Sequence, residues 1–156
     1  MRYARGNIPP ACPVRTPQFQ CEMRETIEHV LLVDDEDDYH FITRIVLKKA
    51  GFNGKFECFY SADEAMARLR TDSTKPDLIL LDINMPGYTG FDMLRTMEAE
   101  GLLPNGTSLV VMCSSSNRPM DIAVARRSPC VDDYMEKSFD VEKFEHLGHL
   151  FRLKRA

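Results

Sequence analysis

The sequence has no apolar run approaching the ~20 residues that a membrane-spanning helix requires. It also lacks an extended basic stretch, because 20 lysines and arginines stand against 24 aspartates and glutamates and the formal net charge is −4. The basic residues are scattered apart from a short C-terminal group, Arg152, Lys154 and Arg155. These absences predict a protein that neither spans a membrane nor binds nucleic acid through a cationic surface.

A cysteine pattern typical of a secreted or zinc-binding protein is missing too. The five cysteines are an odd number and widely spaced, and no second Cys or His pair accompanies Cys12 and Cys21 at zinc-ligand spacing. We expect reduced thiols, with Cys58, Cys113 and Cys130 in or beside strands as small hydrophobic residues. A bridge or half a metal site at Cys12 and Cys21 is the alternative.

The N-terminus lacks the apolar core of about 7–15 residues that a secretory signal needs. Residues 1–26 carry four of the nine prolines and no apolar periodicity, which predicts a disordered tail. Residues 27–156 have the length of one domain. We therefore expect a single cytoplasmic domain behind a tail.

From Glu28 onward, short apolar runs alternate with amphipathic stretches. This pattern is typical of a parallel sheet whose strands are buried on both faces and joined by crossover helices. The sequence therefore predicts an α/β protein, a three-layer sandwich around five parallel strands. The expected strands are His29–Val33, Lys55–Phe59, Asp77–Leu81, Ser108–Cys113 and Val131–Met135.

Five helices are expected between and after these strands. In the first, apolar residues recur at helical spacing (Ile42, Ile45, Val46 and Ala50), and Gly51 follows as a C-terminal cap. The second helix opens with a capping box at Ser61–Glu64, and the third runs from about Gly90 to Glu100. The fourth has Pro119 in its first turn, and the fifth has Asp140 as N-cap. The fifth has Val141, Phe144, Leu147 and Phe151 on one face.

Polar residues follow the predicted strands at their carboxyl ends, where ligands bind in an open parallel sheet. Asp34 and Asp35 follow the first strand, Asp82 the third, Ser114 the fourth, and Lys137 lies two residues beyond the fifth. Three carboxylates in one place repel one another unless a cation lies among them. An all-oxygen set of this kind suits Mg²⁺.

Four segments in this order resemble the receiver domains of two-component response regulators, including the chemotaxis-type single-domain regulators. The likeness covers about residues 28–154 and rests on Leu31–Asp35, Asp77–Gly90, Val110–Ser114 and Asp133–Lys137. The resemblance implies a flavodoxin-like receiver fold with strand order 2-1-3-4-5 over residues 27–156. It also implies a phosphorelay switch that catalyses only its own phosphorylation and dephosphorylation, and is otherwise no enzyme.

The resemblance implies a role for each strand-end residue. Asp82 is similar to the phosphoacceptor, a carboxylate nucleophile. Asp34 and Asp35 are similar to the acidic pair that binds Mg²⁺ together with Asp82, and Asn84 to the residue whose backbone carbonyl is a further ligand. Three other residues resemble partners of the phosphoryl group: Lys137 pairs with its oxygens, Ser114 moves to hydrogen-bond it, and the rotamer of Tyr134 follows that movement.

One position departs from the family pattern. The family lysine is normally followed by a cis proline, but Lys137 is followed by Ser138. A cis bond before a non-proline residue costs about 2.5–4 kcal/mol, so the bond is either trans with an adjusted loop or strained. The direction of the lysine side chain is therefore left open at this point.

Other charged residues receive structural interpretations. Glu36, Asp37 and Asp38 are expected to open the first helix, where acids complement the helix dipole. The histidines (His29, His40, His146 and His149) have no companions at ligand spacing and are expected to be structural or surface residues.

The resemblance implies a histidine kinase or histidine phosphotransfer protein as donor. A downstream protein would bind the surface of the fourth helix, fifth strand and fifth helix. Two alternatives remain. An aspartate-nucleophile phosphatase usually has a second acid two residues after the nucleophile, where this chain has Asn84. A degenerate receiver would act as a binding module without phosphorylation, although Asp34, Asp35, Asp82 and Lys137 are all present.

Overall fold

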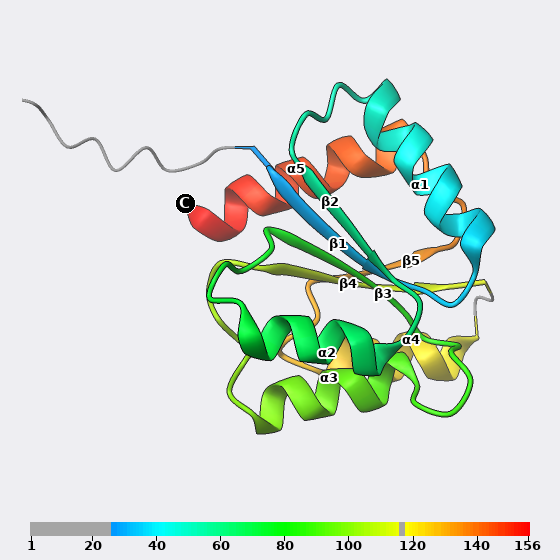
Figure 1. Ribbon diagram of the computed structural model, residues 1–156, viewed down its shortest axis with the longest axis vertical. Coiled ribbons are helices and arrows are strands. Elements are labelled where there is room, and N and C mark those ends of the chain that lie inside the picture. Colours follow the sequence, from blue (N-terminus) through cyan, green and yellow to red (C-terminus); the bar gives the residue numbers. More distant parts are fainter. Residues whose placement is uncertain (1–25, 116–117) are drawn as a thin grey trace, which may run out of the picture.

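The computed structural model describes residues 26–115 and 118–156, and strands and helices alternate through them (Figure 1). The predicted N-terminal tail, with Cys12 and Cys21, lies outside the described residues except for Thr26. The elements are β1 (His29–Val33), α1 (Asp37–Lys49), β2 (Lys55–Phe59), α2 (Ala62–Thr71), β3 (Leu78–Asp82), α3 (Gly90–Ala99), β4 (Leu109–Ser114), α4 (Pro119–Arg127), β5 (Asp133–Glu136) and α5 (Val141–Arg155).

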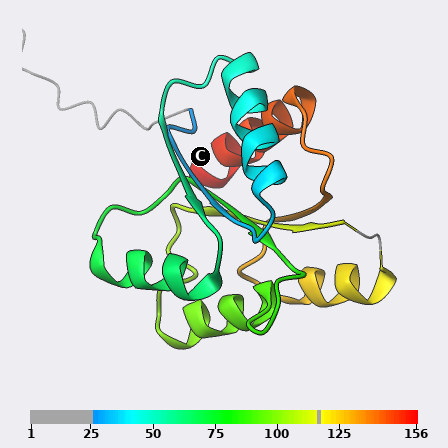
Figure 2. The same ribbon diagram turned by 45° about the vertical axis from the view of Figure 1, so that its right-hand side comes forward.

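The five strands form one parallel sheet in the order β2-β1-β3-β4-β5. Each strand is parallel to its neighbours, with Val33 opposite Leu81 and Asp82 opposite Cys113 in the register. Helices α1 and α5 cover one face of the sheet, and α2, α3 and α4 cover the other (Figures 1 and 2). The predicted three-layer fold and its strand order are therefore confirmed.

The sheet separates two cores, because successive side chains of a strand point to opposite faces. Leu31 and Val33 pack toward α2, α3 and α4, whereas Val30 and Leu32 pack toward α1 and α5. Every residue of β1, β3 and β4 is buried. At about 1.5–3 kcal/mol for each buried leucine or valine, this apolar surface holds the strand ends in place.

The predicted strand bounds hold for β1 and β2, but β3 and β4 each begin and end one residue later, and β5 begins and ends later too. Asp77 and Ser108 lie outside the strands, and their side chains form hydrogen bonds with backbone groups of neighbouring segments. The Asp77 carboxylate accepts the backbone N–H groups of Glu28 and His29 at 2.9 and 3.1 Å. Ser108 Oγ donates to the Pro76 carbonyl at 2.6 Å.

The predicted apolar face of the first helix is only partly correct, because Val46 is buried but the two isoleucines are not. Ile42 and Ile45 are 46% and 38% exposed. The buried face instead consists of Tyr39, His40, Thr43, Val46 and Leu47. Three of these five residues carry polar groups, and hydrophobic spacing alone does not detect buried positions of this kind.

The helix ends follow their predicted signals more closely. Gly51 has φ +79°, the left-handed conformation expected of a C-terminal cap. Ser61 Oγ accepts the Glu64 N–H at 3.3 Å, and the Asp140 carboxylate accepts the Lys143 N–H at 2.8 Å. A complete capping box, with both bonds present, occurs at Thr89 and Asp92 ahead of α3.

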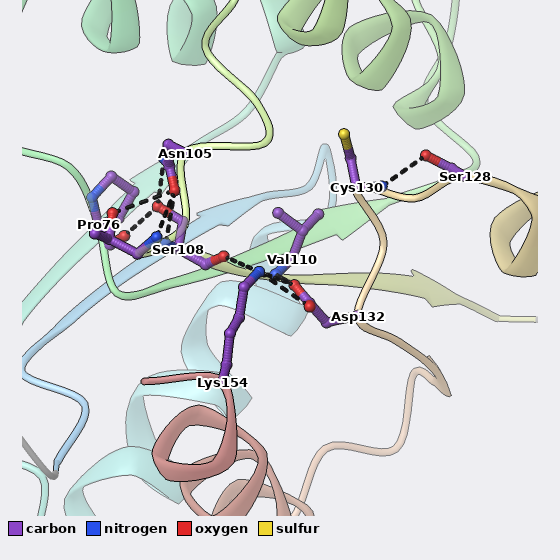
Figure 3. A network of polar contacts seen from close by, with 9 residues as sticks. Pro76, Asn105, Ser108, Val110, Ser128, Cys130, Asp132 and Lys154 are labelled. Carbon is purple, nitrogen blue, oxygen red and sulfur yellow. Dashed lines mark hydrogen bonds and ion pairs between the residues drawn. The ribbon is translucent and has the colours of Figure 1, made fainter. Parts of the chain in front are cut away.

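A polar network fastens the end of α5 to the sheet at the amino ends of the strands (Figure 3). Lys154 Nζ donates to the Ser108 carbonyl at 2.7 Å and pairs with the Asp132 carboxylate at 2.8 Å. Asp132 in turn accepts the Val110 N–H at 2.8 Å. The network fixes the C-terminal end of α5 at the edge of the sheet opposite the carboxyl ends of the strands.

The described cysteines, Cys58, Cys113 and Cys130, are free thiols as predicted. Within residues 26–115 and 118–156, no helix combines the length and the apolar character needed to cross a membrane.

Glu57 of β2 is the centre of an ion-pair cluster. Its carboxylate lies 2.8 Å from His29 Nε2, 2.9 Å from Lys55 Nζ and 2.9 Å from an Arg68 guanidinium nitrogen. Burial alone would raise the pKa of Glu57, but the hydrogen bonds from Lys55, His29 and Arg68 outweigh it, so the pKa is lowered. The charged form of Glu57 therefore stabilises the fold.

We expect Glu57→Gln to lower the free energy of unfolding at pH 7 by about 1–3 kcal/mol, because the substitution removes charge-assisted hydrogen bonds. A lowered folded-state pKa gives stability that is present above the unfolded-state pKa and is lost as pH falls through the folded-state pKa. The difference between the two proteins should therefore shrink between pH 5 and about pH 3. Urea unfolding across this range measures it, and a difference that stays constant with pH would contradict the assignment.

Candidate functional site

The candidate site lies at the carboxyl ends of four strands. Asp34 directly follows β1, Asp82 is the last residue of β3, Ser114 is the last residue of β4, and Lys137 directly follows β5. Parallel pairing brings these strand ends to the same edge of the sheet. Residues separated by up to about a hundred positions in sequence thus become neighbours, as expected from their places after the strands.

Lys137 lies among three carboxylates. Its Nζ is 2.8 Å from Asp34 Oδ2, 3.2 Å from Asp82 Oδ2 and 3.3 Å from Glu36 Oε1. The side chains of Asp34 and Asp82 are 0% exposed and that of Lys137 is 6% exposed. The ammonium group also lies 5.2 Å from the centre of the Tyr39 ring. The lysine therefore bridges two buried acids that would otherwise repel each other.

Burial and mutual repulsion govern the protonation of this group. Burial, and then the charge of Asp34, raises the pKa of Asp82 to about 6, against the opposing effect of Lys137. Burial likewise raises the pKa of Asp34, although its contact with Lys137 opposes the shift. Burial would lower the pKa of Lys137, but its bonds and charge interactions with Asp34 and Asp82 outweigh that, and the pKa is raised.

Backbone contacts hold the strand ends in register. The Asp34 N–H donates to the Phe59 carbonyl at 3.0 Å, and the Lys137 N–H donates to the Ser114 carbonyl at 2.8 Å. Gly90 allows the loop after β3 to fold back, because a Cβ at this position would lie 2.1 Å from the Asp82 carbonyl oxygen. The position of Asp82 thus depends on a residue without a side chain eight positions later.

Asn84 links the third and fourth strands. Its backbone N–H donates to Asp82 Oδ1 at 3.2 Å, and its side-chain amide donates to Ser114 Oγ at 3.3 Å. Ser114 is buried. The structure therefore places the predicted switch hydroxyl beside the loop that follows the predicted phosphoacceptor.

The acidic residues suit a hard cation. Carboxylate oxygens of Asp34, Asp35 and Glu36 lie within 4.8 Å of one another, and Asp35 and Glu36 are exposed to solvent. With Asp82 the site carries four acidic groups and one buried lysine, so negative charge is in excess. Oxygen donors in such an excess fit Mg²⁺. Of the predicted metal residues, Asp34 and Asp35 are in this acidic group. Asp82 is not in it, but its carboxylate contacts the same lysine as Asp34 does.

Tyr134 of β5 is half-buried and packs against the core formed with α2, α3 and α4. A cavity of about 200 Å³ lies between α4 and β5, lined in part by Ala125, Arg126 and Tyr134. The predicted switch aromatic therefore lies next to unfilled space.

The peptide bond after Lys137 is trans, since the cis bond among the described residues is at Leu103–Pro104. Ser138 uses groups that a proline would lack. Its N–H donates to the Glu136 carbonyl at 2.8 Å, and its Oγ accepts from Lys143 Nζ at 2.8 Å. These bonds direct the loop so that Lys137 still reaches Asp34 and Asp82, which answers the question that the sequence left open.

Two neighbours of the site were not expected from the sequence. Glu36 was interpreted only as a helix-opening acid, yet its carboxylate contacts Lys137. His40 was interpreted as a structural or surface residue, yet its Nε2 lies 2.6 Å from the Asp34 carbonyl oxygen. The sequence signal for both is proximity, since they lie two and six residues after Asp34.

A five-stranded parallel sheet with an acidic group and a lysine at its carboxyl edge defines a receiver domain of two-component signalling. The sequence matches the response regulator receiver domain family over residues 30–147, more than half of the chain, and the chain belongs to this family.

Curated relatives agree. Two-component response regulator ORR41 of Oryza sativa is 30% identical over 131 residues, covering 84% of this chain and 99% of that protein. DNA-binding response regulator MtrA of Mycobacterium tuberculosis is 30% identical over 112 residues, covering 72% of this chain. The match covers 45% of the MtrA protein, so the chain spans about half the length of these relatives.

Solved structures show the same fold. A two-component response regulator from Cytophaga hutchinsonii has a TM-score of 0.72 and 28% identity, covering 83% of this chain and 97% of that one. A response regulator receiver protein from Dyadobacter fermentans has a TM-score of 0.66 and 29% identity, covering 78% and 96%.

We expect opposite effects on stability from two substitutions in the site. Lys137→Met should lower the free energy of unfolding by about 3–5 kcal/mol, because buried carboxylates lose their cation. Asp82→Asn should raise it by about 0.5–2 kcal/mol, because one of the repelling charges is removed. Urea unfolding at pH 7.5 with a chelator present measures both, with the exposed Lys49→Met on α1 as control. Destabilisation by Asp82→Asn would contradict this account.

Proposed function

We propose that this domain is a phosphorylation switch that accepts a phosphoryl group on Asp82. The observation that supports this best is the placement of Asp82, buried at the end of β3 with Lys137 at 3.2 Å and Asp34 beside the same ammonium group. A buried carboxylate suits transfer of a dianionic group when a fixed cation lies beside it and neighbouring acids can hold a divalent cation.

In the proposed reaction, a carboxylate oxygen of Asp82 attacks the phosphorus of a phosphohistidine. The new O–P bond forms as the P–N bond breaks, and the bonding electron pair stays with the imidazole nitrogen of the donor. Lys137 then pairs with an oxygen of the transferred group, exchanging its contact with the Asp82 carboxylate for one with the phosphoryl group. The Asn84 N–H holds the other oxygen of Asp82. Water then hydrolyses the O–P bond, which releases inorganic phosphate and restores the Asp82 carboxylate.

The metal site proposed for this reaction consists of Asp34, Asp35, Asp82 and the backbone carbonyl of Asn84, with Glu36 beside it. Mg²⁺ held by these residues would neutralise their charge and offset the negative charge that develops on the transferring phosphoryl oxygens. Asp34, whose carbonyl and carboxylate are both fixed by hydrogen bonds, orients the acidic pair.

The partners follow from this chemistry. A histidine kinase or histidine phosphotransfer protein is the proposed donor, and we propose that the domain spans residues 27–156 and acts in the cytoplasm without binding nucleic acid itself. The domain would convert no substrate other than its own aspartate. A stand-alone role is supported by ORR41, a relative that the chain matches over 99% of its length. The output partner is proposed to bind the surface of α4, β5 and α5.

We expect Mg²⁺ and a small phosphodonor such as acetyl phosphate to add one phosphoryl group to the protein, as measured by intact mass. Asp82→Asn should abolish the gain, because an amide is a poor nucleophile. Asp38→Asn, which changes an exposed acid of α1, is the matched control and should leave the gain intact. Phosphorylation that persists in Asp82→Asn, or that proceeds equally in a chelator, would refute the assignment.

The switch is proposed to act through Ser114 and Tyr134. A phosphoryl group on Asp82 would draw the Ser114 hydroxyl away from Asn84, and Tyr134 would turn into the space released. The cavity between α4 and β5 supports this proposal, because a movement there displaces few packed atoms.

Loading with the phosphoryl mimic beryllofluoride should therefore change amide hydrogen exchange in α4, β5 and α5. Coupling of about 1–3 kcal/mol predicts a change of roughly 5–150-fold in partner affinity. Ser114→Ala should still accept the phosphoryl group but show a smaller exchange response. Responses confined to α1 and α2, with α4 to α5 unchanged, would overturn this output mechanism.

A further inference from the structure

We propose that His40 is a positioning residue for the acidic pair: its ring holds the peptide group that joins Asp34 to Asp35. This inference rests on the proposed function, since it assigns to His40 a part in divalent-cation binding. It concerns a residue whose sequence context indicated only a structural role.

The contact is short and shielded from water. His40 is 3% exposed, and its Nε2 lies 2.6 Å from the main-chain oxygen of Asp34. A carbonyl oxygen can only accept, so Nε2 must carry the hydrogen. The other ring nitrogen, Nδ1, is buried and has no hydrogen-bond partner among the described residues. The ring therefore gives its one hydrogen-bond donor to the peptide group between the two acids.

The ring itself is held in place. It stacks on Tyr60, with ring centres 4.4 Å apart and the planes inclined by 29°. Tyr60 OH donates to Asp37 Oδ1 at 2.7 Å, which ties the outer side of the stack to the first turn of α1. Since Tyr60 belongs to the loop after β2, His40 is fixed between two elements that flank the acidic pair.

This bond completes the restraint of Asp34. The Asp34 N–H already donates to the Phe59 carbonyl at 3.0 Å, and Asp34 Oδ1 accepts the Glu36 N–H at 2.8 Å. Without the bond from His40, the Asp34 carbonyl group could still rotate. The peptide plane that sets the direction of Asp35 would rotate with it. Asp35 is exposed and has none of the packing that fixes Asp34, so its direction depends on that plane.

The expected effect of His40 on Mg²⁺ affinity can be estimated from residues that orient ligands in other metal sites. Residues that orient ligands through a hydrogen bond typically contribute about 10–100-fold to metal affinity. We expect the lower end of this range for His40, because Asp34 keeps its two other hydrogen bonds and its ion pair with Lys137.

The test compares three variants of His40 with a matched control. Glutamine can place its amide nitrogen near the position of Nε2, whereas asparagine places it near Nδ1, and phenylalanine keeps the ring without a donor. His149→Phe makes the same change at an exposed position of α5. The Mg²⁺ dissociation constant of the full chain is measured by calorimetry with Mg²⁺ alone, at a temperature below the melting transition of every variant.

We expect His40→Asn and His40→Phe to bind Mg²⁺ roughly 10-fold more weakly, His40→Gln to stay within about 3-fold of the unaltered protein, and His149→Phe to be unchanged. The phosphorylation rate of His40→Asn should recover as Mg²⁺ is raised to saturation. If His40→Phe fails to fold, the comparison of glutamine with asparagine decides.

Two results would overturn the inference. One is Mg²⁺ affinity in His40→Asn or His40→Phe equal to that of the unaltered protein, and the other is equal weakening in His40→Gln and His40→Asn. Failure of the unaltered protein itself to bind Mg²⁺ would refute the proposed function and this inference with it. Normal binding by the unaltered protein together with unaffected His40 variants would refute the inference alone.

Discussion

The constraint on which the site depends is the burial of two like charges beside one lysine. Asp34 and Asp82 are fully buried, and Lys137 lies 2.8 and 3.2 Å from them. Such a group is stable only while the cation stays in place, because an unpaired buried carboxylate costs several kcal/mol. The loop after β5 is therefore tied down, through the Lys137 N–H to the Ser114 carbonyl and through Ser138 to Lys143.

The rest of the fold supplies a rigid edge for these charges and a softer region beside them. Strands β1, β3 and β4 are buried along their whole length, so their last residues cannot move independently of two cores. In contrast, α4 buries a single residue, Ala125, and a cavity is lined by residues of α4 and β5. Sparse packing lowers the cost of local rearrangement. A charge added at the rigid edge would thus be expected to act on α4 and β5 first.

Much of this arrangement could be predicted from the sequence. The strand-end positions of Asp34, Asp82 and Lys137 follow from the apolar runs and the parallel topology, whereas the strand order was implied by the resemblance to receiver domains. The first helix was less predictable. Its isoleucines, Ile42 and Ile45, are exposed, whereas His40 and Thr43 are buried. Apolar spacing cannot detect a buried polar residue such as His40, whose hydrogen-bond partner is the main-chain oxygen of Asp34 just after β1.

The sequence by itself determined which residues reach the carboxyl edge of the sheet, because periodicity and strand length decide where each strand ends. Only the tertiary structure decided how those residues interact. Glu36 approaches Lys137 across 101 positions, and His40 takes the Asp34 carbonyl while its ring stacks on Tyr60. Such contacts depend on distances and directions set by the packing of helices on the sheet. Local sequence patterns carry no information about these, since each contact joins elements whose relative position is fixed by the whole core.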